Sequence, residues 1–468
     1  MKRTKIVATI SDKRCEPDFL KQLIEAGVNV VRLNTAHLDH ESALYIINNV
    51  RSVDDKVAIL IDTKGPEVRT SRYGEEISTE YGELITVVGN QEGKSGNHIL
   101  YVSYPHLTRD IPVGTCVLID DGDISLNVIE VLKDSLLCKV ENGGIIKLRK
   151  SVNFPGIKLE LPSITQKDKE FIDFAVEHEI DFIAHSFVQS ANDIFEIRTQ
   201  LDVKKSPIRI IAKIENQTGV DNIDEILNEA DGIMVARGDL GIEIAAEKIP
   251  GIQHQLVRKC IRMKKPVIIA TQMLHSMIQN PRPTRAEISD IAAAIYERAD
   301  AIMLSGETAF GPYPVEAVNV MTRVANEVEQ QLDHLPFSNV TPEEDSILAT
   351  LAHSAVLACH SHDIKAIITD TLGGRTGRYL SAYRGNSPVF AMCFYPHIMR
   401  QLALSYGIEA YLVKRQNSRD GFMDEAIQMI AKKGYLSPDD LVVVLGGSFG
   451  PANGASFIEI AQVKNLVG

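Results

Sequence analysis

Charged and polar residues stand where several short apolar runs of the chain end. Three of these runs end in a pair of such residues that are two positions apart. The pairs are Arg32 and Asn34, Lys213 and Glu215, and Arg237 and Asp239. A spacing of two places both side chains on one face of a strand. The sequence therefore predicts three strand ends that each present two polar groups to the same side.

Glu215 and Asp239 are expected to project from neighbouring strands. Two converging carboxylates offer hard oxygen ligands of the kind that Mg²⁺ or Mn²⁺ prefers. Lys213 and Arg32 would stand beside that ion, and cations around it predict a pocket for a doubly anionic ligand such as a phosphate ester. The segment RGDLG adds backbone N–H groups that can hold an anionic oxygen. The alternative is that Lys213 and Glu215 form only a structural ion pair.

Eight short β-branched runs must position these residues, and helix-like stretches such as PDFLKQLIEAG lie between them. The runs are KIVATI, VNVVRLN, KVAILIDT, DFIAHSF, IRIIAKIE, GIMVARGDL, PVIIATQ and AIMLSGE. Apolar strands that alternate with helices predict a parallel sheet, and eight of them predict a closed barrel. Active sites of such barrels lie at the carboxyl ends of the strands, where Asp62, Thr63, Thr271, Ser305 and Glu307 also fall.

The domain organisation follows from changes in this pattern. Residues 1–69 and 157–335 are expected to form the catalytic barrel, and residues 70–156, which lack the helical period, an inserted β-barrel lid domain. The stretch DHLPFSNVTPEED is expected to be a linker to a regulatory domain at 346–468. The predicted fold class is α/β, a (β/α)8 TIM barrel with an inserted small all-β domain and a C-terminal open α/β domain.

Composition narrows the class of partner. The chain has 468 residues, enough for two or three domains, and a net charge of −13, which repels nucleic acid and anionic membranes. Its six cysteines are scattered without C-x-x-C spacing, so neither disulfides nor a zinc site is expected. Neither a signal peptide nor a membrane-spanning run is expected, and a cytoplasmic location is predicted.

Nine segments between residue 4 and about residue 320 carry a family resemblance. They are KIVATI, RLN with His37, DTKGPEVRT, VNFPG, DFIAHSF, AKIEN, MVARGDLG, ATQMLHSM with NPRPTRAE, and IMLSGETAFGPYPVEA. In this order they resemble the successive motifs of pyruvate kinase. The resemblance implies phosphoryl transfer from phosphoenolpyruvate to ADP, giving pyruvate and ATP in the last step of glycolysis. It also implies allosteric control and a homotetramer.

The resemblance implies roles for the catalytic and substrate-binding residues. Arg32 would bind the phosphoryl group, and Lys213 would stabilise the transferring group and the enolate. Gly238, Asp239 and Thr271 would hold the substrate. Phosphoryl transfer asks a protein mainly for positioning and charge stabilisation, which these groups supply. Thr271 is expected either to pass a proton from water to the enolate or only to position the carboxylate.

The same resemblance extends to the ions and the nucleotide. Glu215 and Asp239 would bind Mg²⁺ or Mn²⁺, and Glu67 is similar to the potassium-dependent members. The K⁺ ligands would be Asn34, Asp62 and Thr63, and the nucleotide-binding residues would be Asn34, His37, Arg69 and Lys150.

Ala36 is the most pointed departure from the family pattern, because a serine hydroxyl would ordinarily help to ligate K⁺ there. A backbone carbonyl or water would have to replace it, so weakened potassium dependence is expected. Further departures, which are expected to alter surroundings rather than chemistry, are Thr35, Leu38, Ser151, His275 and Phe310.

Two stretches of the last domain, TLGGRTGR at 371–378 and GGSFGPANGAS at 446–456, resemble effector loops. Their hydroxyls and backbone amides would cradle a sugar phosphate or a nucleotide. The expected effector residues are Thr371, Gly373, Gly374, Arg375 and Thr376. The alternative is a plain turn between strand and helix.

Two other functions compete with the kinase. One is an aldolase or acyl-ester lyase that shares the KIEN and GDL elements, and Arg69 and Lys150 argue against it because such an enzyme has no nucleotide to cover. The other is a catalytically weak regulatory binding protein. The intact Lys213, Glu215 and Asp239 argue against that reading, which only Ala36 supports.

Overall fold

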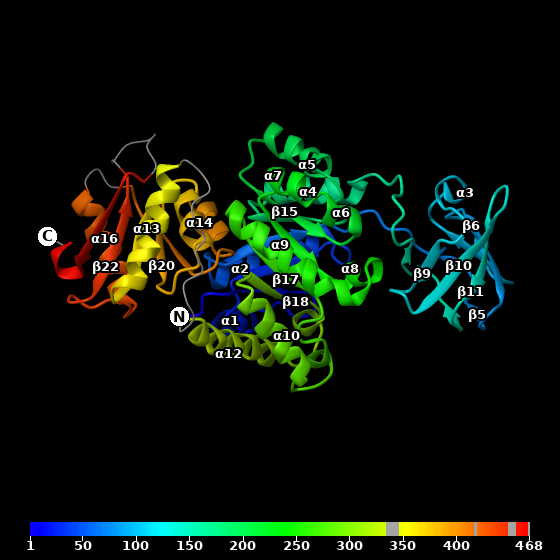
Figure 1. The fold of residues 1–468 in the computed structure, drawn as a ribbon, viewed down its shortest axis with the longest axis horizontal. Coiled ribbons are helices and arrows are strands. Elements are labelled where there is room, and N and C mark those ends of the chain that lie inside the picture. Colours follow the sequence, from blue (N-terminus) through cyan, green and yellow to red (C-terminus); the bar gives the residue numbers. More distant parts are fainter. Residues whose placement is uncertain (334–345, 416–418, 448–454, 467–468) are drawn as a thin grey trace.

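A closed barrel of eight parallel strands forms the centre of the computed structural model, with helices around it (Figure 1). The structure describes residues 1–333, 346–415, 419–447 and 455–466. The expected linker spans 333–345; its first residue, Asp333, ends a barrel helix, and the other residues lie outside the described residues. The strands are β1 (Lys5–Thr9), β2 (Val30–Asn34), β3 (Ala58–Asp62), β14 (Phe182–His185), β15 (Arg209–Ile214), β16 (Gly232–Ala236), β17 (Val267–Ala270) and β18 (Ala301–Leu304).

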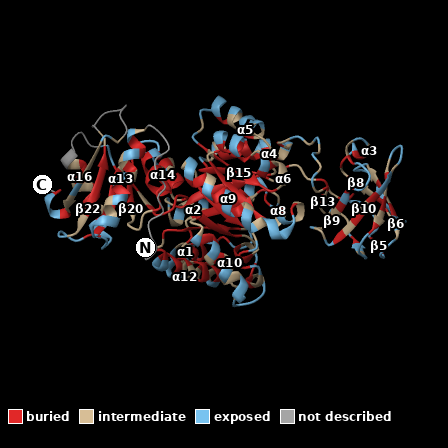
Figure 2. Cartoon of the chain, viewed as in Figure 1, coloured by how far each residue is buried: buried red, intermediate tan, exposed pale blue. Residues whose placement is uncertain are grey.

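The barrel strands are apolar on both faces, which is why they read as continuous apolar runs. Inward side chains such as Val30, Leu60, Phe182 and Met234 fill the interior, and outward ones pack against the helices. Figure 2 shows the buried strands inside a shell of half-exposed helices. These helices are α1 (Pro17–Ala26), α2 (His40–Val53), α4 (Gln166–Glu177), α5 (Ala191–Val203), α6 (Gln217–Asp221), α7 (Ile223–Glu229), α8 (Arg237–Glu243), α9 (Ile249–Met263), α10 (Arg285–Tyr296), α11 (Gly306–Ala309) and α12 (Pro314–Asp333).

An all-β insertion leaves the barrel after β3 and returns before β14, two strands that are hydrogen-bonded neighbours. Its main sheet has the strand order β13-β9-β10-β11-β6-β8, and its pairs are mostly antiparallel. The elements are β4 (Tyr73–Gly74), β5 (Ile77–Thr79), β6 (Leu84–Gly89), β7 (Lys94–Ser95), β8 (Ile99–Val102), α3 (Leu107–Asp110), β9 (Cys116–Ile119), β10 (Ile124–Val131), β11 (Leu136–Val140), β12 (Gly144–Ile146) and β13 (Val152–Asn153).

The C-terminal part is an open α/β sheet with the order β21-β20-β19-β22-β23, parallel except for β23 at one edge. The predicted fold class is thus confirmed. The elements are α13 (Ile347–Ser361), β19 (Ile364–Thr371), α14 (Arg375–Ala382), β20 (Val389–Cys393), α15 (Pro396–Leu402), β21 (Ile408–Leu412), α16 (Arg419–Lys432), β22 (Leu441–Gly446) and β23 (Phe457–Gln462).

This sheet domain is attached at the amino end of the barrel strands, opposite the site. Leu404 packs among the inward side chains of the barrel, and Lys5 Nζ donates to the carbonyl of Ile408 over 2.6 Å. Arg384 and Asp300 form a buried ion pair between the two domains, 2.6 Å from Nη2 to Oδ2. The insertion and the C-terminal sheet therefore occupy opposite ends of the molecule (Figure 1). In the part of the chain that the structure describes, every helix is too short or too polar to cross a membrane.

Candidate active site

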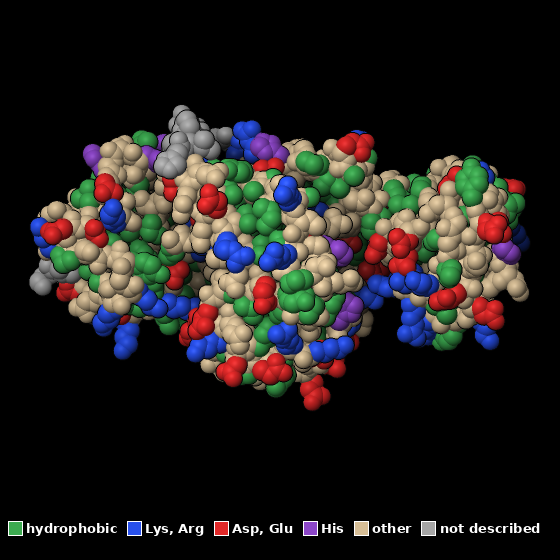
Figure 3. Space-filling model, turned by 90° about the horizontal axis from the view of Figure 1, so that it is seen from below, with side chains coloured by type: hydrophobic (Ala, Val, Ile, Leu, Met, Phe, Trp, Pro, Cys, Tyr) green, Lys and Arg blue, Asp and Glu red, His purple; other side chains and the backbone are tan. Residues whose placement is uncertain are grey.

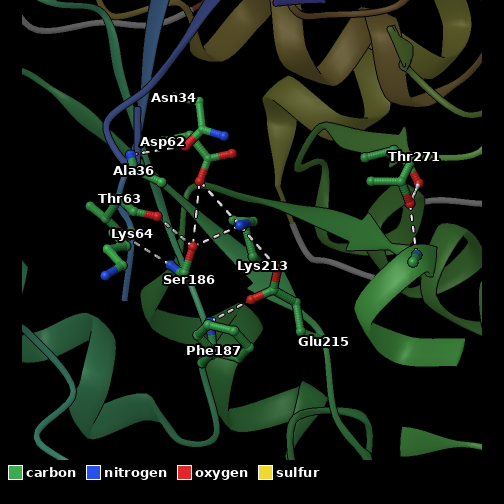
Figure 4. Close-up of polar contacts among 12 residues, drawn as sticks. Asn34, Ala36, Asp62, Thr63, Lys64, Ser186, Phe187, Lys213, Glu215 and Thr271 are labelled. Carbon is green, nitrogen blue, oxygen red and sulfur yellow. Dashed lines mark hydrogen bonds and ion pairs between the residues drawn. The ribbon is translucent and has the colours of Figure 1, made fainter. Parts of the chain in front are cut away.

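Lys213 lies near the carboxyl end of β15 and joins groups from three neighbouring strand ends. Its Nζ is 3.1 Å from Oδ1 of Asp62 and 2.9 Å from Oε1 of Glu215. It also donates to Oγ of Ser186 over 2.6 Å (Figure 4). The Lys213 side chain is only 11% exposed. The ammonium is therefore fixed in place by three oxygen atoms.

Asp62 is shared between two cations. Nε of Arg32, on the adjacent strand β2, donates to Oδ2 of Asp62 over 2.6 Å, and Nη1 of Arg32 donates to Oγ1 of Thr9. Burial alone would raise the pKa of Asp62, but Arg32 and Lys213 outweigh it and lower that pKa. Burial disfavours the ammonium of Lys213, yet the surrounding carboxylates outweigh it and raise the pKa of Lys213. Asp62 and Lys213 therefore stay charged at neutral pH.

Glu215 and Asp239 are the two carboxylates expected to bind a divalent ion. Oε2 of Glu215 accepts a hydrogen bond from the backbone N of Phe187 over 2.7 Å. Burial raises the pKa of both carboxyl groups, and Asp121 and Glu67 raise that of Asp239 further. Burying like charges together is unfavourable unless a cation lies between them. The donor set therefore fits Mg²⁺ or Mn²⁺.

The number of protein ligands also fits such an ion. Within the described residues, no group of three or more His, Cys, Asp or Glu side chains is arranged to hold a metal. Mg²⁺ in phosphoryl-transfer sites is commonly bound by one or two carboxylates, and substrate phosphates and water complete its shell. Two carboxylates are thus sufficient for a metal that binds together with its substrate.

Thr271 follows β17 and faces the first turn of α8. Its Oγ1 accepts a hydrogen bond from the backbone N of Gly238 over 2.7 Å. In Figure 4 Thr271 lies apart from the Lys213 cluster, on the loop that follows β17. A ligand held by both Lys213 and Thr271 would therefore bridge the carboxyl end of the barrel.

Not every predicted pair shares a strand face. Arg32 and Asn34 both lie in β2, as predicted, whereas Glu215 follows the end of β15 at Ile214 and still contacts Lys213. The prediction for Arg237 and Asp239 is wrong, because β16 ends at Ala236 and both residues belong to helix α8. Residues two apart on a helix do not face the same way.

The two polar residues after β18 do not reach the Lys213 cluster. Both Oε atoms of buried Glu307 accept backbone hydrogen bonds, from Ser305 over 2.8 Å and from Leu274 over 3.1 Å. Glu307 therefore braces the loop after β17. Ser186 was missed, although it carries the same sequence signal, a polar residue directly after a barrel strand.

A cavity of about 420 Å³ separates the insertion from the barrel. Asp120 and Lys150 line it from the insertion, Arg69 lines it from the segment that leads into the insertion, and Glu215 and Asp239 line it from the barrel. Figure 3 shows acidic and basic side chains together at the constriction between these two parts. The cavity thus has basic residues on one side and the two predicted metal ligands on the other. The predicted nucleotide-binding residues Asn34 and His37 lie outside its lining.

Both basic residues of the cavity are held by acidic neighbours. Nε of Arg69 donates to Oε2 of Glu67 over 2.7 Å, and its Nη1 donates to the carbonyl of Arg149. Nζ of Lys150 donates to Oδ1 of Asp120 over 2.8 Å. These ion pairs orient two cations that border the cavity, an arrangement suited to phosphate groups.

The predicted K⁺ ligands lie together at the ends of β2 and β3. Asn34 and Asp62 are direct neighbours in the barrel register, and Thr63 follows Asp62. The backbone N of Ala36 donates to Oδ1 of Asn34 over 3.1 Å, so a side chain at position 36 starts beside these oxygen atoms (Figure 4). Here it is a methyl group, which cannot act as a ligand.

The predicted effector residues form one turn after β19. Thr371 ends this strand, and Gly374, with φ of +77°, precedes the first turn of α14, to which Arg375 and Thr376 belong. The carbonyl of Gly373 faces Nη2 of Arg209 at 3.4 Å. Residues 448–454 of the second Gly-rich stretch lie outside the described residues.

Two family models match the chain. The model for the pyruvate kinase barrel domain matches residues 1–318, and the model for the pyruvate kinase alpha/beta domain matches residues 349–461. These matched segments contain both the barrel and the C-terminal sheet described above.

Similar proteins carry the same family name. Pyruvate kinase of Borreliella burgdorferi is 44% identical over 100% of this chain and 98% of its own. Pyruvate kinase of Bacillus licheniformis is 42% identical over 100% of this chain and 81% of its own. The crystal structure of a pyruvate kinase from Cryptosporidium parvum has a TM-score of 0.93 at 36% identity, covering 99% of this chain and 96% of that one. The chain therefore belongs to the pyruvate kinase family and transfers the phosphoryl group of phosphoenolpyruvate to ADP, giving pyruvate and ATP in the last step of glycolysis.

Proposed function

We propose that Lys213 and Arg32 are the catalytic cations of this phosphoryl transfer. The observation that carries the proposal is the position of Nζ of Lys213, within 3.1 Å of both Asp62 and Glu215. A preorganised ammonium at this point stabilises negative charge on the transferring group and on the enolate oxygen that remains. Arg32, fixed through Asp62, binds the phosphoryl oxygens and keeps them beside Lys213.

We propose that Glu215 and Asp239 hold Mg²⁺ or Mn²⁺. When bound, the ion neutralises charge on the substrate oxygens. Gly238 and Thr271 then bind the carboxylate of the substrate, because the backbone N of Gly238 and Oγ1 of Thr271 lie 2.7 Å apart and both can donate to a carboxylate that replaces the hydrogen bond between them. Thr271 also passes the proton from water to the enolate carbon.

We propose that ADP binds in the 420 Å³ cavity, with its phosphates against Arg69 and Lys150. Residues 70–156 act as a lid that closes over it and excludes water. Residues 1–69 and 157–335 act as the catalytic domain, and residues 346–468 as the regulatory one. Asn34, which ends β2, and His37, three residues later, reach the nucleotide when the lid is closed.

The monovalent ion, the effector and the assembly are further parts of the proposal. Asn34, Asp62 and Thr63 ligate K⁺ weakly, because Ala36 supplies no oxygen. The turn of Thr371, Gly373, Gly374, Arg375 and Thr376 binds a sugar-phosphate or nucleotide effector in a homotetramer. A cytoplasmic location suits the cysteines, which are all free.

The first test is the Lys213→Met variant. Pyruvate and ATP formation from phosphoenolpyruvate and ADP is measured with Mg²⁺, with and without K⁺. We expect the variant to lose at least about a hundredfold in kcat, because one preorganised charge is typically worth roughly 3 to 4 kcal/mol in the transition state.

The matched control is Lys204→Met, which removes a partly exposed lysine of the same barrel, paired only with Asp173 on the surface. Its activity should equal that of the unmodified chain. If Lys213→Met retains more than a tenth of the control rate, the role proposed for Lys213 is wrong.

A further inference from the structure

Thr271 has a backbone conformation that its residue type disfavours. Its φ is +66°, and Gln272 follows with φ of +57°. A β-branched side chain in this left-handed region clashes with its own backbone, so such a residue persists only where its surroundings impose the conformation. Because β17 ends at Ala270, this bend turns the chain away from the strand and sets the direction of the Thr271 hydroxyl.

Three hydrogen bonds hold the bend. Nη2 of Arg237 donates to the carbonyl of Thr271 over 2.8 Å. Oγ1 of Thr271 accepts from the backbone N of Gly238 and donates to the carbonyl of Ala270, each over 2.7 Å. Of these contacts, the one from Arg237 fixes the peptide plane after Thr271, so it governs the backbone rather than the hydroxyl itself.

Arg237 occupies an unfavourable place for a cation. It is the first residue of α8, and the amino end of a helix favours negative charge. Its side chain is 9% exposed, and its Nε has no hydrogen-bond partner among the described residues. What holds the guanidinium there is Asp290 on α10, whose Oδ1 accepts from Nη1 over 2.7 Å. Gln253 contributes a longer contact of 3.5 Å.

We propose that Arg237, held by Asp290, is a positioning residue for Thr271. The guanidinium does not reach the reacting atoms; it fixes the left-handed bend and thereby the direction of the hydroxyl. Lysine cannot replace it, because only the planar fork of arginine binds a carboxylate on one side and a carbonyl on the other. This inference rests on the role of Thr271 proposed above.

The test separates proton transfer from phosphoryl transfer. Exchange of the methyl protons of pyruvate with D₂O, followed by NMR with Mg²⁺ present, needs the enolate and its proton donor but no ADP. Arg237→Lys and Asp290→Asn should both slow this exchange and lower kcat, Arg237→Lys on the order of tenfold or more, since small misplacements of a reacting group are costly. The KM for phosphoenolpyruvate should change less than kcat.

Arg400→Lys is the matched control. Arg400 is also buried and paired with an aspartate, Nε to Oδ1 of Asp181 at 2.6 Å, but it lies at the other end of the barrel. The Arg400→Lys variant should have a lower melting temperature but exchange the methyl protons of pyruvate at the rate of the unmodified chain. Asp290 is 36% exposed at its side chain, so Asp290→Asn keeps the test open if Arg237→Lys does not fold.

The outcomes distinguish this inference from the function proposed for Thr271. If Thr271→Ala abolishes exchange while Arg237→Lys and Asp290→Asn exchange at the rate of Arg400→Lys, the positioning role is overturned and the role of Thr271 stands. If Thr271→Ala exchanges normally, the role proposed for Thr271 and the positioning role of Arg237 are both wrong. The role of Lys213 is tested separately, by Lys213→Met.

Discussion

The pKa values of Asp62 and Glu215 move in opposite directions, although both carboxyl groups touch Lys213. Both are fully buried, so burial raises both. Asp62 faces a second cation, Arg32, whereas Glu215 faces a second carboxylate, Asp239. The charge of Asp62 is therefore balanced by two side chains, Arg32 and Lys213. Glu215 shares the ammonium of Lys213 with Asp62 and also meets the charge of Asp239, so its own charge is only partly balanced, which suits a ligand to a divalent ion.

In the K⁺ site proposed at Asn34, Asp62 and Thr63, we expect the residue at position 36 to set how tightly the ion binds. Ala36→Ser would place a hydroxyl beside Oδ1 of Asn34, since the backbone at position 36 already contacts that atom. One added neutral oxygen ligand is worth about 1 kcal/mol, so we expect the K⁺ concentration for half-maximal rate to fall roughly fivefold.

Phe310→Lys serves as the comparison for this titration, because it restores another family residue at an exposed position. It should leave the K⁺ requirement unchanged. An Ala36→Ser enzyme whose half-maximal K⁺ concentration is equal to or above that of the unmodified chain would contradict the proposed ligand set.

The strands of the barrel were predictable from sequence because both their faces are buried, which leaves long apolar runs. β23 carries no such signal, since its residues are half-buried or exposed and FIEIAQ lacks a long apolar run. The place of Arg237 was mispredicted for a different reason. Nothing in GIMVARGDL marks the point where the strand ends and the helix begins, and that point lies directly before Arg237.

Helix α4 supports the loop that follows β3. The α4 carboxylate of Asp168 completes a capping box with Thr165 and also accepts from the backbone N of Lys64, which follows the predicted K⁺ ligand Thr63. His185, the last residue of β14, is 1% exposed, and neither ring nitrogen has a hydrogen-bond partner among the described residues. The His185 imidazole therefore has no partner that would stabilise its charged form, and burial favours its neutral form.

His185 makes the fold sensitive to acid. Burial lowers its pKa to about 4, despite the nearby Asp193 and Asp168, while an unfolded histidine has a pKa of about 6.5. Between these values the unfolded chain binds a proton that the folded chain does not, so stability falls as pH falls from about 6.5 to about 4. The full loss is about 3 kcal/mol.

His185→Leu should remove this contribution. We expect the urea midpoint of the variant to fall less between pH 7.5 and about pH 5 than that of the unmodified chain. His362→Leu changes an exposed histidine, and its urea midpoint should fall with pH as much as that of the unmodified chain. Equal slopes for His185→Leu and the unmodified chain would show that His185 is not the titrating group.

At the scale of the whole molecule, the two ends of the barrel contact different domains. The carboxyl ends of the strands carry the site and the insertion, and the amino ends carry the C-terminal sheet. Buried ion pairs fasten the second junction, among them Arg384 with Asp300 and Arg400 with Asp181. Asp300 also accepts from the backbone N atoms of Val267 and Tyr406. Substitutions at this junction should therefore lower the stability of the domain contact more than they lower the catalytic rate.

Arg384→Met should loosen the junction strongly. The side chains of Arg384 and Asp300 are 2% and 3% exposed, so the variant leaves a buried carboxylate without its cation, which typically costs about 3 to 5 kcal/mol. Thermal unfolding should shift to clearly lower temperature, and adding Asp300→Asn should recover part of the loss. Lys464→Met breaks only the exposed pair with Asp439 and should cost under about 1 kcal/mol. Equal shifts for the two single variants would contradict this account.

The pairing of β1 with β18 also bears on how the protein is made. Lys5 is in register with Ala301, so the first strand cannot close the ring until nearly the whole barrel has left the ribosome. At about 5 to 20 residues per second, that interval lasts roughly 15 to 60 seconds. Throughout it, one edge of β1 presents unpaired N–H and C=O groups to other chains. Synthesis, rather than the finished fold, is thus the stage at which this protein is most exposed to aggregation and most dependent on chaperones.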